Sequence, residues 1–243
     1  RLMSERFDVL VVGAGLFGAT CAYELTRRGL RCMVLEKRHH VGGNCYSERR
    51  DGIDVHVYGP HIFHTNDQRI WDWVGRFSRF NGYRHRVKAC YDGKLFSFQV
   101  NLETFRQLWG VTTSEEALAH LERVRVPRRD TDNLEGWALS QYGAELYGKI
   151  IKGYTWKQGG EAPSELSSAI LRRRPFRLTA DDGYFHDGHF QGCPTQGYET
   201  IFTQLLAGSE LRLQCDYFED RAHFDRLLLA APDLESARQR ERE

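Results

Sequence analysis

Three glycines at the spacing Gly-x-Gly-x-x-Gly follow an apolar run near the start of the chain, and they constrain its fold more than any other feature. The run covers residues 7–12, the glycines are Gly13, Gly15 and Gly18, and a second apolar run ends in Glu36. This order is typical of the first βαβ unit of a dinucleotide-binding fold, which consists of a strand, a tight glycine turn, a helix and a second strand that ends in an acid. The segment therefore predicts an α/β protein with a nucleotide cofactor.

Each residue of this turn has its own physical task in the prediction. Gly13 permits the tight turn, Gly15 lets a pyrophosphate approach the backbone, and Gly18 lets the helix pack on the strand. Phe17 lies in the first helical turn, where free N–H groups face the phosphate. Glu36 is placed to accept hydrogen bonds from the ribose hydroxyls, and Lys37 follows it directly.

A second glycine pair helps to distinguish between FAD and NAD, the two cofactors that such a turn can bind. Gly42-Gly43 comes six residues after Glu36 and is followed by Asn44. It resembles the continuation found in flavin enzymes, in which backbone near the acid wraps the adenosine and pyrophosphate. The pair favours FAD, with NAD as the alternative.

Composition excludes several other classes of function. The chain has 243 residues, 41% of them hydrophobic, and a formal net charge of +1, so it has no global field to attract nucleic acid or an anionic membrane. No apolar run approaches a membrane span and the first residues contain no signal-peptide core, which predicts a cytoplasmic protein. The six cysteines form no C-x-x-C pair, and His61 and His64 have no accompanying ligand cluster, so no metal is expected.

Hydrophobic spacing divides the rest of the chain. It predicts a β-hairpin over residues 84–100, helices from residue 101 and a further strand over residues 211–218. We expect a Rossmann-like FAD-binding domain, a small antiparallel sheet near the substrate and a helical insert. Their predicted bounds are 1–80 with 198–231 for the first, 81–100 with 171–197 for the second and 101–170 for the third, before a charged tail at 232–243.

Three further segments carry a second, independent signal. They are His56-Val-Tyr-Gly-Pro-His-Ile-Phe-His-Thr65, Lys152-Gly-Tyr-Thr-Trp-Lys-Gln158, and residues 163–182 with Arg177. With these segments in order, the chain resembles the bacterial UDP-galactopyranose mutases from about Phe7 to about Phe218. The resemblance implies interconversion of UDP-galactopyranose and UDP-galactofuranose, by nucleophilic attack of reduced FAD N5 on the anomeric carbon of the sugar.

The same resemblance implies roles for particular residues. His61 corresponds to the family's histidine beside the flavin, and Arg177 to an arginine that steadies the diphosphate, which its guanidinium suits by bidentate geometry. Tyr154, Thr155, Trp156 and Tyr184 are the other expected substrate-binding residues. The alternatives are a turn-capping histidine at His61, an ordinary buried aromatic at Tyr154 and a solvated arginine at Arg177. The expected partner is a UDP-galactose-type nucleotide sugar, and the resemblance allows a homodimer.

Two departures from the family pattern limit the expectation. Gly159 stands where the family has a tryptophan that walls the active site, and Trp156 is the candidate to compensate. Similarity fades after about Phe224, so the chain reads as C-terminally truncated relative to the family, without a second diphosphate arginine and two tyrosines. Two alternatives therefore stay open. One is a mutase for another nucleotide sugar, and the other is a non-catalytic homologue that binds nucleotide or an intact partner.

Overall fold

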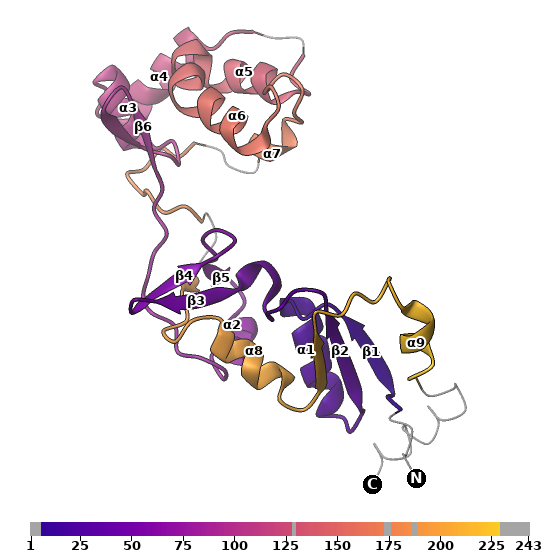
Figure 1. Ribbon diagram of the computed structural model, residues 1–243. Coiled ribbons are helices and arrows are strands. Elements are labelled where there is room, and N and C mark those ends of the chain that lie inside the picture. The colour runs from indigo at the N-terminus through magenta and orange to yellow at the C-terminus, as the bar shows by residue number, and fades with distance from the viewer. Residues whose placement is uncertain (1–5, 128–129, 173–175, 186–188, 229–243) are drawn as a thin grey trace, which may run out of the picture. The chain divides into compact units, whose positions relative to one another are not determined.

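The computed structural model describes residues 6–127, 130–172, 176–185 and 189–228, and the chain folds as two compact units (Figure 1). The first unit comprises Arg1–Tyr83 with His189–Glu243, and the second comprises Arg84–Gly188. Each unit has its own hydrophobic core. The predicted tail at 232–243 lies outside the described residues.

The first unit is built on a parallel sheet of three strands. Its order is β1 (Val9–Val12), β2 (Cys32–Glu36) and β9 (Glu210–Leu213), and helix α1 (Leu16–Thr26) connects the first two. Figure 1 shows α1 beside these strands. The sequence motif therefore forms the predicted βαβ unit, and β9 joins it from a segment far along the chain.

Strand β2 is buried on both faces, as a parallel strand between helices must be. Val34 packs into a core with Phe202 of α8 (Glu199–Leu206). Met33 and Leu35 point to the opposite core, where α9 (Arg221–Asp225) contributes Phe224. Residues 223–225 lie in α9, and Leu228 makes a parallel bridge with Phe7.

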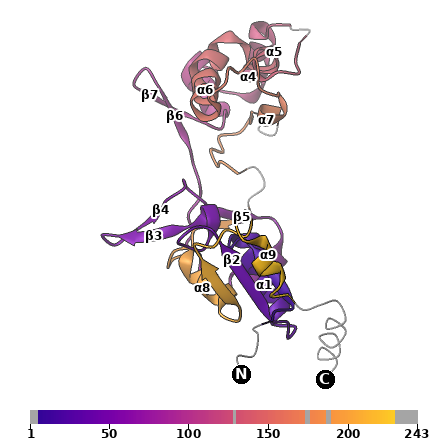
Figure 2. The same ribbon diagram turned by 45° about the vertical axis from the view of Figure 1, so that its right-hand side comes forward.

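Short antiparallel pairs complete the first unit. They are β3 (Ser47–Arg50) with β4 (Ile53–His56), and β5 (Phe63–Thr65) with β8 (Phe190–Gly192), alongside helix α2 (Gln68–Val74) and the 3-10 turn η1 (Gly43–Cys45). Figure 2 shows the β3–β4 hairpin along its length.

One predicted grouping is wrong. We expected 171–197 to form an antiparallel region with 81–100, but β8 pairs with β5 in the first unit, with Phe63 opposite Gly192. The pairing depends on a close approach that sequence spacing does not reveal. A Cβ on Gly192 would lie 2.3 Å from the carbonyl oxygen of Asn81, so only glycine fits there.

The second unit contains a hairpin, which lies within the range 84–100 predicted for it, and a series of helices that begins after residue 101. Its elements are β6 (Lys88–Tyr91), β7 (Lys94–Ser97), α3 (Leu102–Trp109), α4 (Ser114–Val124), α5 (Leu134–Leu146), the π-helix η2 (Tyr147–Lys152), α6 (Gly153–Gly159) and α7 (Ala169–Arg172). Side chains cap three of these helices: Asn101 caps α3, Thr113 caps α4 in a reciprocal pair with Glu116, and Asn133 caps α5. Such caps satisfy backbone N–H groups that a helix start leaves open.

The α5–η2 helix contains a kink at Gly143. This residue has φ +75°, and a Cβ on it would lie 2.6 Å from the carbonyl oxygen of Val124. The left-handed backbone and the close approach of α4 both require glycine. The kink sets the direction of η2 and α6, which carry the residues of the second cavity described below.

We expect Gly143→Ala to lower the free energy of unfolding by at least about 2 kcal/mol, because it adds a steric clash to left-handed backbone strain. Gly148, in η2, has no positive φ, and a Cβ added to it would meet no atom within 4 Å. Gly148→Ala is the matched control, and urea denaturation should show a change within about 1 kcal/mol. Equal losses in the two variants would contradict the assignment.

Candidate functional site

A cavity of about 300 Å³ opens at the carboxyl end of the parallel sheet in the first unit. One wall contains Gly13, Glu36, Lys37, Gly43 and Asn44, all of which the sequence assigned to the cofactor. The other wall is the segment 215–218 after β9. Ligands of open α/β sheets bind outside the carboxyl ends of the strands, so this cavity has the position of a nucleotide site.

The three glycines of the turn have the separate tasks that the motif predicts. Gly13 has φ +102°, which strongly favours glycine. A Cβ on Gly18 would lie 2.0 Å from the carbonyl oxygen of Gly13, so Gly18 is required for packing. At Gly15 a Cβ would meet no atom within 4 Å, so this glycine keeps open the space that an added side chain would fill.

The carboxylate of Glu36 ties the glycine turn to the second glycine pair. Its Oε2 accepts the N–H of Ala14 at 2.9 Å, and its Oε1 accepts the N–H of Arg38 at 2.9 Å. The carbonyl of Ala14 in turn accepts the N–H of Gly42 at 2.8 Å. Glu36 is buried, and each of its carboxylate oxygens can accept a further hydrogen bond.

The N-terminus of α1 faces this turn. Gly15 is its N-cap residue, and among the described residues no side chain caps the helix. Open N–H groups and the helix dipole together favour a phosphate at this position. These features fit the ADP half of a dinucleotide. Phe17, which the sequence assigned to the cofactor, is 84% exposed and is absent from the lining of the cavity.

His61 lies in the same unit, in the turn between β4 and β5. Its Nδ1 lies 2.8 Å from the carbonyl oxygen of Gly59 and donates to it, its N–H donates to Nδ1 of His56 at 3.0 Å, and its carbonyl accepts from the hydroxyl of Tyr198 at 2.9 Å. The backbone of His61 is thus fixed from both sides. Nδ1 is committed to the turn, and Nε2 takes no part in this contact.

A second cavity, of about 430 Å³, lies within the second unit. Tyr154 and Thr155 line it, and the ring of Tyr154 lies 4.2 Å from that of Phe98 between centroids. Gln99 and Gln158 are further polar members of its lining. Most of the remaining lining is aliphatic, and an apolar cavity with some aromatic rings and a few amide groups suits a planar base that also makes hydrogen bonds.

Trp156 does not line this cavity. It lies on helix α6, and its side chain is 56% exposed. The expected compensation for Gly159 therefore does not occur in this cavity, because two residues along a helix turn the side chain away from the face of Tyr154. A Cβ on Gly159 would lie 3.4 Å from Leu166, and Gly159 is absent from the lining of this cavity.

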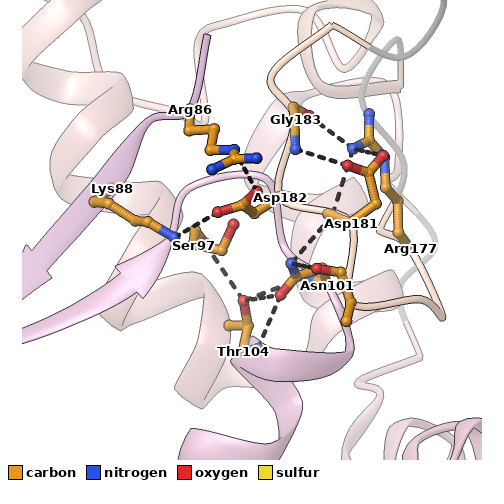
Figure 3. Close-up of polar contacts among 10 residues, drawn as sticks. Arg86, Lys88, Ser97, Asn101, Thr104, Arg177, Asp181, Asp182 and Gly183 are labelled. Atoms are coloured by element: carbon orange, nitrogen blue, oxygen red, sulfur yellow. Dashed lines mark hydrogen bonds and ion pairs between the residues drawn. The ribbon is translucent and has the colours of Figure 1, made fainter. Parts of the chain in front are cut away.

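The predicted diphosphate arginine is buried and paired (Figure 3). The side chain of Arg177 is 7% exposed, and its Nη1 donates to Oδ2 of Asp181 at 2.8 Å and to the carbonyl of Gly183 at 2.7 Å. Its Nη2 is buried and has no hydrogen-bond partner among the described residues. A buried donor without a partner costs about 1–3 kcal/mol. Arg177 is therefore not the solvated arginine of the alternative.

The segment that carries Arg177 is anchored along its length. The backbone N–H of Arg177 donates to the carbonyl of Val100, a residue that lines the second cavity. Nδ2 of Asn101 donates to the carbonyl of Asp181 at 3.1 Å. Further on, the N–H of Tyr184 donates to the carbonyl of His85, and its ring packs against that of His85. Tyr184 is thus held beside the hairpin and is absent from the lining of the second cavity.

Asp182 binds two cations of strand β6 and the residues before it (Figure 3). Its carboxylate lies 2.9 Å from Nζ of Lys88 and 3.0 Å from Nε of Arg86. The hydrogen bond from Lys88, with the charges of Lys88 and Arg86, lowers the pKa of Asp182 below its usual value. Neighbouring acids thus have different partners: Asp181 faces Arg177, and Asp182 faces the hairpin.

Neither a metal-ligand cluster nor a membrane-spanning helix occurs among the described residues. No three His, Cys, Asp or Glu side chains in this part of the chain gather as a metal site would require. None of its helices is long and apolar enough to cross a membrane.

Two family models match the chain, and the second match runs from the second unit into the first. A family described as NAD(P)-binding Rossmann-like domain matches residues 11–77, and one described as UDP-galactopyranose mutase matches residues 149–235. The second match extends past Phe224, where we expected the similarity to fade. It contains Tyr154, Thr155 and Arg177.

Individual relatives match most of the chain. It is 39% identical over 227 residues to a probable UDP-galactopyranose mutase of Klebsiella pneumoniae, and 36% identical over 224 residues to a dTDP-fucopyranose mutase of Escherichia coli. These alignments cover 89% and 90% of this chain, and 59% of each relative. A crystal structure of reduced UDP-galactopyranose mutase shares the fold, with a TM-score of 0.62 and 18% identity over 85% of this chain and 48% of that one.

The glycine turn, the parallel sheet and the match to a Rossmann-like domain define a dinucleotide-binding protein of the α/β class. Within that class, the chain resembles the UDP-galactopyranose mutases, whose family model matches residues 149–235. It spans about 59% of the length of the relatives it matches.

Sequence reasoning missed part of each cavity. In the first unit it did not assign the segment 215–218, although the end of a parallel strand is a general signal for a ligand site. In the second unit it missed Phe98, which the alternation of the predicted hairpin places but does not single out. It also missed Asp181 as the partner of Arg177.

The turn that holds His61 should weaken in acid. Burial, and next the charge of His61, lower the pKa of His56 from 6.5, against an opposing effect of Asp54. The neutral Nδ1 of His56 accepts from His61, so this contribution to stability is complete above pH 6.5 and is lost as pH falls below it. NMR titration should give His56 a midpoint below 6.5, and the stability difference between wild type and His56→Gln should shrink towards about pH 5. A midpoint above 6.5 would contradict the geometry.

Proposed function

We propose that the protein is a flavin-dependent UDP-galactopyranose mutase that interconverts UDP-galactopyranose and UDP-galactofuranose. The observation that carries the proposal is the cavity of the second unit, because Tyr154 and Thr155 line it and belong to the segment that matches the mutase family. A flavin-dependent enzyme also needs a dinucleotide site, for which the glycine turn of the first unit is the candidate.

In this proposal FAD is the dinucleotide, held by Gly13, Gly15, Gly42, Gly43 and Glu36. Support comes from the hydrogen bonds that join the two glycine segments through Ala14 and Glu36, since both segments then face one ligand. Reduced FAD, when bound, would supply the nucleophile for the anomeric carbon of the sugar.

The chain's own residues bind and orient the substrate. The pyrimidine base is proposed to lie against Tyr154 and Phe98, where stacking on an aromatic face is worth about 1–3 kcal/mol per base. The guanidinium of Arg177 is proposed to bind the diphosphate, for which its charge and planar geometry are suited. His61, held at Nδ1 by its own turn, presents Nε2 as the group that responds to the flavin.

Gly15→Ala should abolish flavin binding without unfolding the protein. The new methyl meets no protein atom within 4 Å and instead fills the space in front of the turn. In cofactor-free protein the free energy of unfolding should change by less than about 1 kcal/mol. Gly82, in the same unit, also has open space and no positive φ. Gly82→Ala should therefore retain the flavin absorbance of wild type, and loss of flavin in both variants would show a nonspecific effect.

The activity itself is tested by anaerobic incubation of dithionite-reduced protein with UDP-galactofuranose, followed by chromatography of the nucleotide sugars. We expect UDP-galactopyranose to form, and the oxidised protein to be inactive. A folded protein that is colourless when purified, and gains no flavin on reconstitution, would refute the proposal and favour a non-catalytic homologue.

A mutase for another nucleotide sugar is the second candidate. Gly159 stands where the family has a tryptophan, and one relative is named a dTDP-fucopyranose mutase. The same incubation with a dTDP-linked fucofuranose separates the two. Conversion of the dTDP sugar alone would assign the second function.

A further inference from the structure

Two hydrogen-bond donors in the second unit converge on one carboxylate (Figure 3). Oδ2 of Asp181 accepts from Nη1 of Arg177 at 2.8 Å, and Oδ1 accepts the N–H of Gly183 at 3.0 Å. A guanidinium nitrogen and a backbone N–H that face one pair of oxygens form an anion-binding arrangement. We call these two donors the anion cradle.

The exposure of the two side chains shows which of them lies between the anion cradle and solvent. The side chain of Arg177 is 7% exposed, whereas that of Asp181 is 56% exposed. The carboxylate therefore lies on the solvent side, between the guanidinium and any ligand that approaches. A buried charge requires a partner, and Asp181 supplies it from within the chain.

The internal partner does not use the whole guanidinium. Nη2 of Arg177 is buried and has no hydrogen-bond partner among the described residues. Asp181 offers two oxygens, and both are already committed to Nη1 and to Gly183. A diphosphate offers more oxygens and more charge, so it can satisfy the cradle and Nη2 together.

The backbone around Asp181 is fixed, so the carboxylate can leave by side-chain rotation alone. The carbonyl of Asp181 is held by Asn101, and the N–H of Arg177 is held by Val100. Asp182 is bound by Lys88 and Arg86 and does not compete for the cradle. Val100, which accepts the backbone N–H of Arg177, also lines the second cavity, so the segment that bears the cradle is joined to a residue of the proposed nucleotide site.

We propose that Asp181 is an internal competitor for the diphosphate: its carboxylate occupies the anion cradle of Arg177 and Gly183, and the ligand's diphosphate displaces it. Asp181 thereby keeps the cation paired when no ligand is bound and lowers the affinity for nucleotide. This inference rests on the proposed function, which assigns the diphosphate to Arg177.

Calorimetric titration with UDP, on the purified full chain, tests the competition. Asp181→Asn removes the charge and keeps an oxygen for Gly183, so UDP should bind about fivefold more tightly, the scale of a partly exposed ion pair. Asp182→Asn is the matched control, because it makes the same change in net charge at the neighbouring position. The dissociation constant of this variant for UDP should lie within about twofold of the wild-type value at about 0.15 M salt, where long-range charge effects are screened.

A purely structural role for Asp181 predicts the opposite change in UDP affinity. If Asp181 only holds the segment in place, its loss should weaken UDP binding. Unchanged or weaker binding in Asp181→Asn, or equal tightening in Asp182→Asn, would overturn the proposal. Circular dichroism checks folding, and Asp181→Ser, which also retains an acceptor for Gly183, repeats the test if the amide variant is unfolded.

Arg177→Gln separates this inference from the proposed function. If it leaves UDP binding unchanged, the diphosphate role of Arg177 fails. If it weakens binding and the double variant with Asp181→Asn binds no more tightly than Arg177→Gln alone, the competition acts through Arg177 as proposed. Equal tightening by Asp181→Asn with and without Arg177 would overturn the inference and leave the proposed function intact.

Discussion

The buried carboxylate of Glu36 is the interaction on which the first unit depends. By accepting the backbone N–H groups of Ala14 and Arg38, it joins the glycine turn to the residues after β2. Gly42 then returns to the carbonyl of Ala14. Hydrogen bonds to a charged acceptor are stronger than neutral ones, so a single side chain fixes the geometry of a site formed by two separate segments.

The site also needs a segment that is remote in the sequence. Strand β9 pairs with β2 and delivers residues 215–218 to the wall opposite Glu36. Parallel strands align their carboxyl ends at the same edge, so pairing alone brings this segment to the cavity. The packing of Phe202 on Val34 holds the connection in place.

The second unit positions its polar groups by local capping and by helix geometry. Asn101 caps α3 and also binds the carbonyl of Asp181, so one side chain joins a helix start to the returning segment. The kink at Gly143 directs η2 and α6, and with them Tyr154, to the cavity. π-Helices are frequent near functional sites, and this one leads directly into the helix that bears the proposed base-binding residue.

The sequence alone determined the βαβ unit, the hairpin and the helix starts, because their signals are local: glycine spacing, alternation and capping residues. It also indicated the resemblance to the mutase family, through motifs that remain recognisable without a structure. Only the tertiary structure decided that β8 pairs with β5, that Trp156 lies outside the cavity and that Arg177 is closed off by Asp181. These outcomes depend on contacts between segments and on which face of an element is buried, and spacing along one chain does not encode either.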